Sequence, residues 1–156
     1  MVIERQYKHK ETGKNIIVAF NDFGYRCGYV EVGHENVIPV YTRLYHKTKQ
    51  YEPDFIVFGG VTFRGLHSII DKTVIGFDCA HYGSKPDIEK YKEYYGNSKL
   101  AEEIDSWVPD KGKIWTADDV SKECESLAVQ IKQVENFYNR QLRVVKRNKW
   151  KHKGWK

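Results

Sequence analysis

Residues able to do chemistry gather in two short stretches of the chain, residues 27–34 and residues 76–83. In the second stretch an acid, a thiol and an imidazole fall within four residues, as Asp78, Cys79 and His81. Alternate residues of an extended backbone share a face, so Cys79 and His81 would point one way and Asp78 the other. Residues of these types can bind a metal ion, supply a nucleophile or hold the polar groups of a ligand.

Metal binding is the first interpretation. Zinc takes thiolate and imidazole ligands, and the chain offers Cys27, His34, Cys79 and His81. Their spacings, C-x6-H and C-x-H, match no common zinc module, in which ligand pairs are closer. We therefore expect no metal and no cofactor.

Nucleophilic catalysis is the second interpretation, with Cys79 activated by His34 or His81. A cysteine in an apolar strand is more often a small, inert hydrophobic residue. The chain also lacks the G-x-G-x-x-G, Walker, G-x-S-x-G and H-E-x-x-H patterns. We assign no catalytic residue, and a metal- or cysteine-dependent hydrolase stays an alternative.

A ligand pocket is the third interpretation and the one we favour. Asp78 and His81 would orient the polar groups of a small, nucleotide-like molecule, and aromatic side chains would stack on its ring. Glycine inside a strand often marks the close approach of a ligand or of another backbone. The predicted ligand-binding residues are His34, Gly59, Gly60, Thr62, Asp78, His81 and Tyr82. The competing explanation is structural, with Asp78 capping a turn and the glycines forming bulges.

Alternating and apolar runs separated by turn residues predict the strands that would position this site. The expected strands are Val2–Lys8, Asn15–Phe20, Tyr25–Val32, one within Asp54–Phe63, and Lys72–Asp78. The continuous apolar run Phe55–Phe58 predicts a central strand buried on both faces. Residues 34–53 are interpreted as a long loop that could cover a site.

The helices follow in the second half of the chain. Short helices are expected over Ile88–Tyr95, which Gly96 would end, and near Leu100–Trp107. Thr116 and Asp119 form a capping box, and apolar residues then recur at helical spacing as far as Val145. Such a helix must bury its apolar stripe, and the sheet is the surface available. We predict one α+β domain over residues 1–145, an antiparallel sheet of about five strands packed against a long C-terminal helix.

Positive charge is concentrated at the C-terminus. The chain of 156 residues has 26 basic and 21 acidic side chains, and residues 146–156 hold six of the basic and none of the acidic ones. We interpret this segment as a flexible, Trp-containing tail and expect contact with nucleic acid only there. No apolar stretch is long enough to span a membrane. The charged start and the three scattered cysteines favour a reducing cytoplasm, and the long amphipathic helix leaves a homo-oligomer open.

The order of these motifs resembles a family of small proteins encoded by tailed bacteriophages and prophages. The resemblance covers roughly residues 25–135, and the block Gly-Phe-Asp-Cys-Ala-His at residues 76–81 is its most specific part. The other matching segments are residues 27–30, 33–34, 59–63 and 124–128. Two positions depart from the family: Phe58 stands where a histidine precedes the double glycine, and Ser84 stands where an aspartate follows the glycine.

The resemblance implies a role in the takeover of a bacterial host, in the host cytoplasm. Several small phage proteins counter bacterial defence by sequestering cyclic-nucleotide signals. By analogy, we expect a non-enzymatic protein that binds a nucleotide-like ligand and sequesters a host defence signal. The alternative is an interaction protein that inhibits a host protein, either an enzyme or a nucleic-acid complex, through its basic tail.

Overall fold

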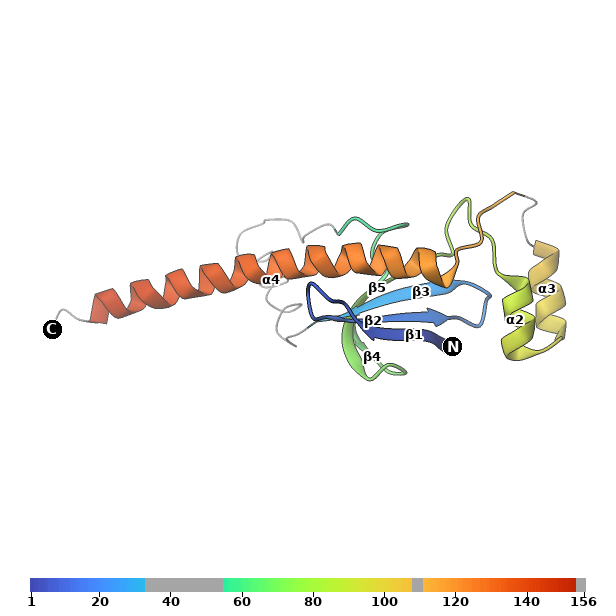
Figure 1. Ribbon diagram of the computed structural model, residues 1–156, viewed down its shortest axis with the longest axis horizontal. Coiled ribbons are helices and arrows are strands. Elements are labelled where there is room, and N and C mark those ends of the chain that lie inside the picture. The colour runs from blue at the N-terminus through green and yellow to red at the C-terminus, as the bar shows by residue number, and fades with distance from the viewer. Residues whose placement is uncertain (33–54, 108–110, 154–156) are drawn as a thin grey trace.

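The structure, a computed structural model, describes residues 1–32, 55–107 and 111–153 (Figure 1). The strands are β1 (Val2–Lys8), β2 (Asn15–Phe20), β3 (Arg26–Glu31), β4 (Phe63–His67) and β5 (Lys72–Asp78). The helices are α2 (Ile88–Tyr95), α3 (Lys99–Trp107) and α4 (Ala117–Lys153). The predicted loop over residues 34–53, which includes His34, lies outside the described residues.

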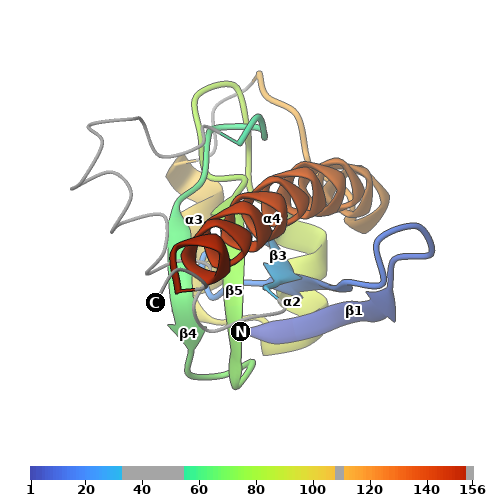
Figure 2. The ribbon, with the colours of Figure 1, turned by 90° about the vertical axis from the view of Figure 1, so that its left-hand side faces the viewer.

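The five strands form one antiparallel sheet in the order β1-β2-β3-β5-β4. The sheet is strongly twisted, so that β4 and β5 run steeply across the direction of β1 (Figure 2). This arrangement and the long helix against it confirm the predicted α+β fold. Strands β1, β2 and β5 also have the predicted bounds.

The prediction of a central strand through Phe55–Phe58 is wrong. Residues 55–57 belong to no strand, and the remaining strand is β4, which pairs only with β5 at one edge of the described sheet. Phe55 and Val57 are buried in the core, whereas Ile56 is 82% exposed. The apolar run therefore reflects packing of alternate side chains rather than burial of both faces of a strand.

Side chains of α4 take the place of a neighbouring strand for this segment. The Ile56 N–H donates to Gln130 Oε1 over 2.8 Å, and Gln130 Nε2 donates to the Ile56 carbonyl over 3.0 Å. Two residues further on, the Phe58 N–H donates to Glu123 Oε2 over 3.2 Å. We call residues 55–61 the strap, because they are fastened to the helix by side chains.

Helix α4 lies across the face of the sheet and contacts β2 and β3 (Figures 1 and 2). Thr116 and Asp119 form the predicted capping box, with the Asp119 N–H donating to Thr116 Oγ1 and the Thr116 N–H donating to Asp119 Oδ2. Gly28 of β3 allows the helix to approach closely, since a Cβ there would lie 2.5 Å from Cys124 Sγ. The fully buried residues of α4 are Val120, Cys124, Leu127, Ala128 and Ile131.

The final helix is longer than the sequence predicts. Residues 146–153, which the sequence analysis assigns to a tail, continue α4 as far as Lys153. No proline or glycine occurs between Thr116 and Gly154, so nothing in this stretch interrupts the backbone hydrogen bonding. Among the described helices none is long and apolar enough to cross a membrane.

Helices α2 and α3 pack together at one end of the sheet (Figure 1). A buried arginine, Arg26, ties this end together. Its guanidinium donates to both oxygens of Glu4 in β1, to Asp87 Oδ2 over 2.9 Å and to the Trp115 carbonyl over 2.7 Å. Because Asp87 caps α2 and Trp115 precedes α4, one side chain joins two strands and the starts of two helices.

Candidate functional site

The Gly-Phe-Asp-Cys-Ala-His block forms the end of β5 and the turn after it. Asp78 closes the strand opposite Cys27 of β3, and its Oδ1 accepts the Ala80 N–H over 2.9 Å. This hydrogen bond caps a local turn, as expected if Asp78 has a structural role. A second turn follows, in which the Ser84 N–H donates to the His81 carbonyl over 2.9 Å. Two turns thus follow one another over residues 78–84.

His81 packs beneath the strap. Its ring lies edge-on to Phe58, with centroids 5.6 Å apart, and Phe58 in turn lies against Trp115 at 4.2 Å. A Cβ at Gly59 would lie 1.9 Å from His81 Cδ2. The close approach expected at Gly59 therefore exists, and the group that approaches is the imidazole of this same chain.

Asp78 and His81 form an acid–imidazole pair without a direct hydrogen bond. His81 Nε2 lies 3.7 Å from Asp78 Oδ1, beyond hydrogen-bonding distance. The side chains of Asp78 and His81 are 31% and 29% exposed, but the Nε2 atom of His81 is itself buried. Among the described residues, two buried side-chain polar atoms lack a hydrogen-bond partner, His81 Nε2 and Ser84 Oγ. Both belong to the same turn.

The other predicted ligand-binding residues are spread around this pair. The Thr62 N–H donates to the Gly76 carbonyl, so its backbone extends the edge of the sheet. A Cβ at Gly60 would meet no atom within 4 Å, which leaves this residue beside open space. Tyr82 is fully exposed. The structure thus brings together Gly59, Asp78 and His81, and it does not show Tyr82 packed against them.

The thiols are not activated. Burial raises the pKa of Cys79 to about 12 and that of Cys27 to about 11, and it raises the pKa of Cys124 as well. Each is therefore protonated near neutral pH, which disfavours a thiolate nucleophile. Over residues 1–32, 55–107 and 111–153, no three or more histidine, cysteine or acidic side chains lie together as a metal site would need.

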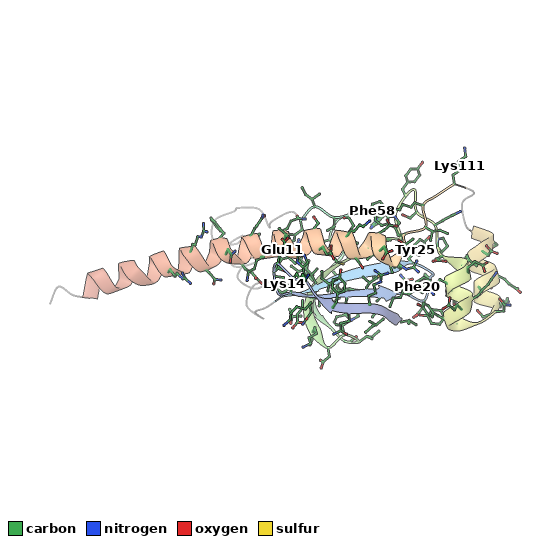
Figure 3. The ribbon with its side chains drawn as sticks, viewed as in Figure 1. Glu11, Lys14, Phe20, Tyr25, Phe58 and Lys111 are labelled. Atoms are coloured by element: carbon green, nitrogen blue, oxygen red, sulfur yellow. The ribbon has the colours of Figure 1, made fainter. Side chains whose placement is uncertain are left out.

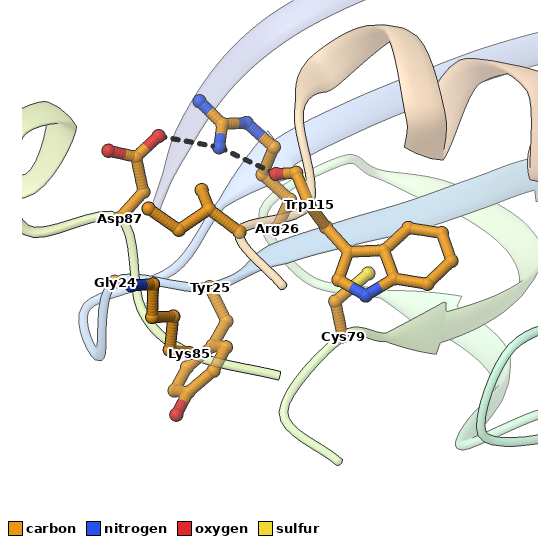
Figure 4. A pocket seen from close by; sticks show the side chains of 8 residues that line it. Gly24, Tyr25, Arg26, Cys79, Lys85, Asp87 and Trp115 are labelled. Atoms are coloured by element: carbon orange, nitrogen blue, oxygen red, sulfur yellow. Dashed lines mark hydrogen bonds and ion pairs between the residues drawn. The ribbon is translucent and has the colours of Figure 1, made fainter. Parts of the chain in front are cut away.

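A shallow hollow lies beside Cys79 and Trp115 (Figure 4). Its lining residues are Gly24, Tyr25, Arg26, Cys79, Lys85, Asp87, Ile114 and Trp115. The hollow encloses no space for even a water molecule, so by itself it is not a binding pocket for a nucleotide. Sequence reasoning missed it, because its walls come from segments far apart in the chain.

Comparisons with family models, with curated proteins and with solved structures find no match to this chain. The resemblance to a phage protein family accordingly stays a prediction. The case for a function rests on the residues and their geometry.

Proposed function

We propose that this is a binding protein whose small, polar ligand is held by the acid–imidazole pair, Asp78 and His81. The observation that carries the proposal is the buried, unpartnered Nε2 of His81 beside the part-exposed carboxylate of Asp78. Buried polar atoms in folded proteins nearly always have a hydrogen-bond partner, so this nitrogen calls for one that the chain itself does not supply, which a bound ligand or water molecule would provide. The pair also stands in the block that the sequence analysis singled out on independent grounds.

The chemistry of the pair constrains the ligand. An ionised carboxylate only accepts hydrogen bonds, so the ligand must present a donor to Asp78. For a nucleotide-like ligand this donor would be a base amino group or a sugar hydroxyl. A phosphate would be repelled by Asp78, so a nucleotide would have to direct its phosphate away from this carboxylate.

Access to Nε2 requires movement of the strap. Gly59 covers the imidazole, and its φ of +70°, like the +82° of Gly60, is a conformation that glycine adopts at little cost. The open space beside Gly60 gives the turn room to move. Ligand binding would then lift the double glycine from the ring while Gln130 still holds Ile56.

The raised pKa values of the three thiols favour binding over cysteine chemistry. Following the family resemblance, we further propose that the protein acts in the cytoplasm of an infected bacterium. There it would sequester a nucleotide-like defence signal rather than consume it. This role would require no catalytic residue.

Thermal shift and calorimetry against nucleosides, linear nucleotides and cyclic nucleotides test the proposal. We expect one class to bind, to be recovered unchanged by mass spectrometry, and to lose at least tenfold in affinity in Asp78→Asn. The matched control is Asp71→Asn, an exposed carboxylate in a turn, which should bind normally. An altered product would indicate an enzyme. Equal affinity of Asp78→Asn and the native chain would remove the acid–imidazole pair as the site.

A further inference from the structure

The C-terminal half of α4 carries most of the positive charge of the molecule. Residues 136–153, which we call the basic extension, hold seven lysines and arginines and no acidic residue. The rest of the chain has 19 basic and 21 acidic residues. The net charge of +5 therefore comes entirely from this one segment of helix. Such a one-signed surface attracts a polyanion.

The basic extension begins just after the last core contacts of α4 among the side chains that the structure describes. Ile131 is fully buried and Val134 packs against the core. Glu135 accepts a hydrogen bond from Lys14 Nζ over 2.6 Å, and Lys14 belongs to the hairpin under the helix (Figure 3). Beyond it Asn136, Arg140 and Arg143 are exposed, and the helix projects past the sheet (Figure 1).

The spacing of the charges matches a helix that contacts a polyanion along its length. Arg140, Arg143, Arg147 and Lys151 follow one another at i, i+3, i+7 and i+11. In an α-helix this spacing places residues on one face, here over about 16 Å of helix axis. The extension as a whole is about 27 Å long.

Repulsion between like charges destabilises a basic helix that has no bound partner. Arg143 and Arg147 are four residues apart, as are Arg147 and Lys151 and also Lys149 and Lys153. Each like-charged pair at this spacing destabilises a helix by a few tenths of a kcal/mol. A polyanion would relieve this repulsion, so binding and helix stability should be linked.

We propose that the basic extension binds double-stranded DNA, with the helix lying in the major groove. The major groove of B-form DNA is about 12 Å wide and admits an α-helix, whereas that of A-form RNA is too narrow. An anionic membrane fits less well, because the apolar residues and the cations of the extension are separated along the helix. Phe137, Tyr138, Leu142, Val144 and Val145 lie in its first half, whereas five of its seven cations lie in residues 146–153, where Trp150 is the one apolar residue. This proposal is independent of the ligand proposed for Asp78 and His81.

The test compares three forms of the full chain by fluorescence anisotropy with a labelled DNA duplex of about two helical turns. One variant replaces Arg140, Arg143, Arg147 and Lys151 with glutamine, which keeps helix propensity. The matched control replaces four exposed body lysines with glutamine: Lys8, Lys10, Lys122 and Lys132. Competitor arms use an RNA duplex of the same length and vesicles containing phosphatidylserine.

We expect the native chain and the body variant to bind the DNA duplex, and the extension variant to bind at least tenfold more weakly. With about four phosphate contacts, native affinity should fall about 100-fold between about 50 and 200 mM salt. Helical circular dichroism should rise on binding in the native chain. Equal loss in both variants, tighter binding to the RNA duplex, or binding to vesicles without binding to DNA would each overturn the proposal.

Discussion

An alanine at position 59 would place a methyl group inside the ring of His81. A Cβ there would lie 1.9 Å from His81 Cδ2, a separation that cannot be tolerated, and the φ of +70° adds backbone strain. We expect Gly59→Ala to lower the free energy of unfolding by about 3 kcal/mol, measured by urea denaturation. The matched variant is Gly60→Ala, which has a similar φ but no atom within 4 Å of its Cβ. It should lose only about 1 kcal/mol. Equal losses would mean that the imidazole does not occupy this position.

The buried thiols give a second prediction for single residues. Because burial raises the pKa of Cys27 to about 11 and that of Cys79 to about 12, only about one thiol in a thousand or fewer is ionised at pH 8. We expect no alkylation of the folded chain by iodoacetamide at pH 8, and three additions after denaturation in urea. Intact-mass spectrometry counts the additions. Rapid modification of Cys79 in the folded chain would reopen the nucleophile interpretation.

Sequence reasoning identifies part of the candidate site. The proximity of Asp78 to His81 follows from their separation in the chain, and the special role of Gly59 follows from residue type. The sequence does not predict that His81 itself fills the space beside Gly59, because this contact joins residues 22 positions apart. The same limit applies to the hollow beside Trp115, whose walls meet only in the folded chain.

At the scale of elements, the strap depends on one glutamine. Gln130 both donates to and accepts from the backbone of Ile56, so Gln130→Ala removes both of its hydrogen bonds to the strap, together with the one it donates to Ser126 Oγ. We expect a loss of about 1–2 kcal/mol in stability and faster amide hydrogen exchange over residues 55–61. The control is Gln133→Ala, an exposed position one turn along the same helix, which should leave both unchanged. If exchange of the Ile56 and Phe58 amides is the same in both variants, other contacts hold the strap.

The strap also shows why element prediction fails at one place. Strands β2 and β5 are predictable because their residues lie between clear turn signals. Phe55–Phe58 has the same composition as a central strand, and apolar content does not specify which groups satisfy its backbone. In the structure those groups are side chains 65 and 74 residues away, Glu123 and Gln130. The end of the last helix is predicted too early for a similar reason. The apolar periodicity stops at Val145 because charged residues follow, but the backbone continues as helix.

At the scale of the whole molecule, Arg26 should dominate the stability of the end that carries α2. Both Arg26 and its partner Glu4 have side chains only 6% exposed. Replacing the arginine with methionine leaves buried carboxylates without a counter-charge, and we expect a loss of about 3–5 kcal/mol in urea denaturation. The control is Arg5→Met, whose arginine pairs with Asp118 at the surface and should cost less than about 1 kcal/mol. Similar losses for the two would show that the Arg26 network is not a stabilising centre.

The division of α4 into a packed half and a basic half predicts that the body folds without the extension. Among the described side chains of α4, Ile131 is the last that is fully buried, Val134 still packs against the core, and Glu135 forms an ion pair with Lys14. A chain ending after Asn136 should therefore keep its cooperative thermal transition within a few degrees of the native midpoint.

The same truncation leaves 18 basic and 21 acidic residues, so its net charge changes sign from +5 to −3. It should cease to bind a cation exchanger at pH 7 and lose affinity for duplex DNA. A truncated chain that fails to fold would instead show that residues beyond Asn136 pack against the body, and the charge of this half of the helix would then serve the fold as well.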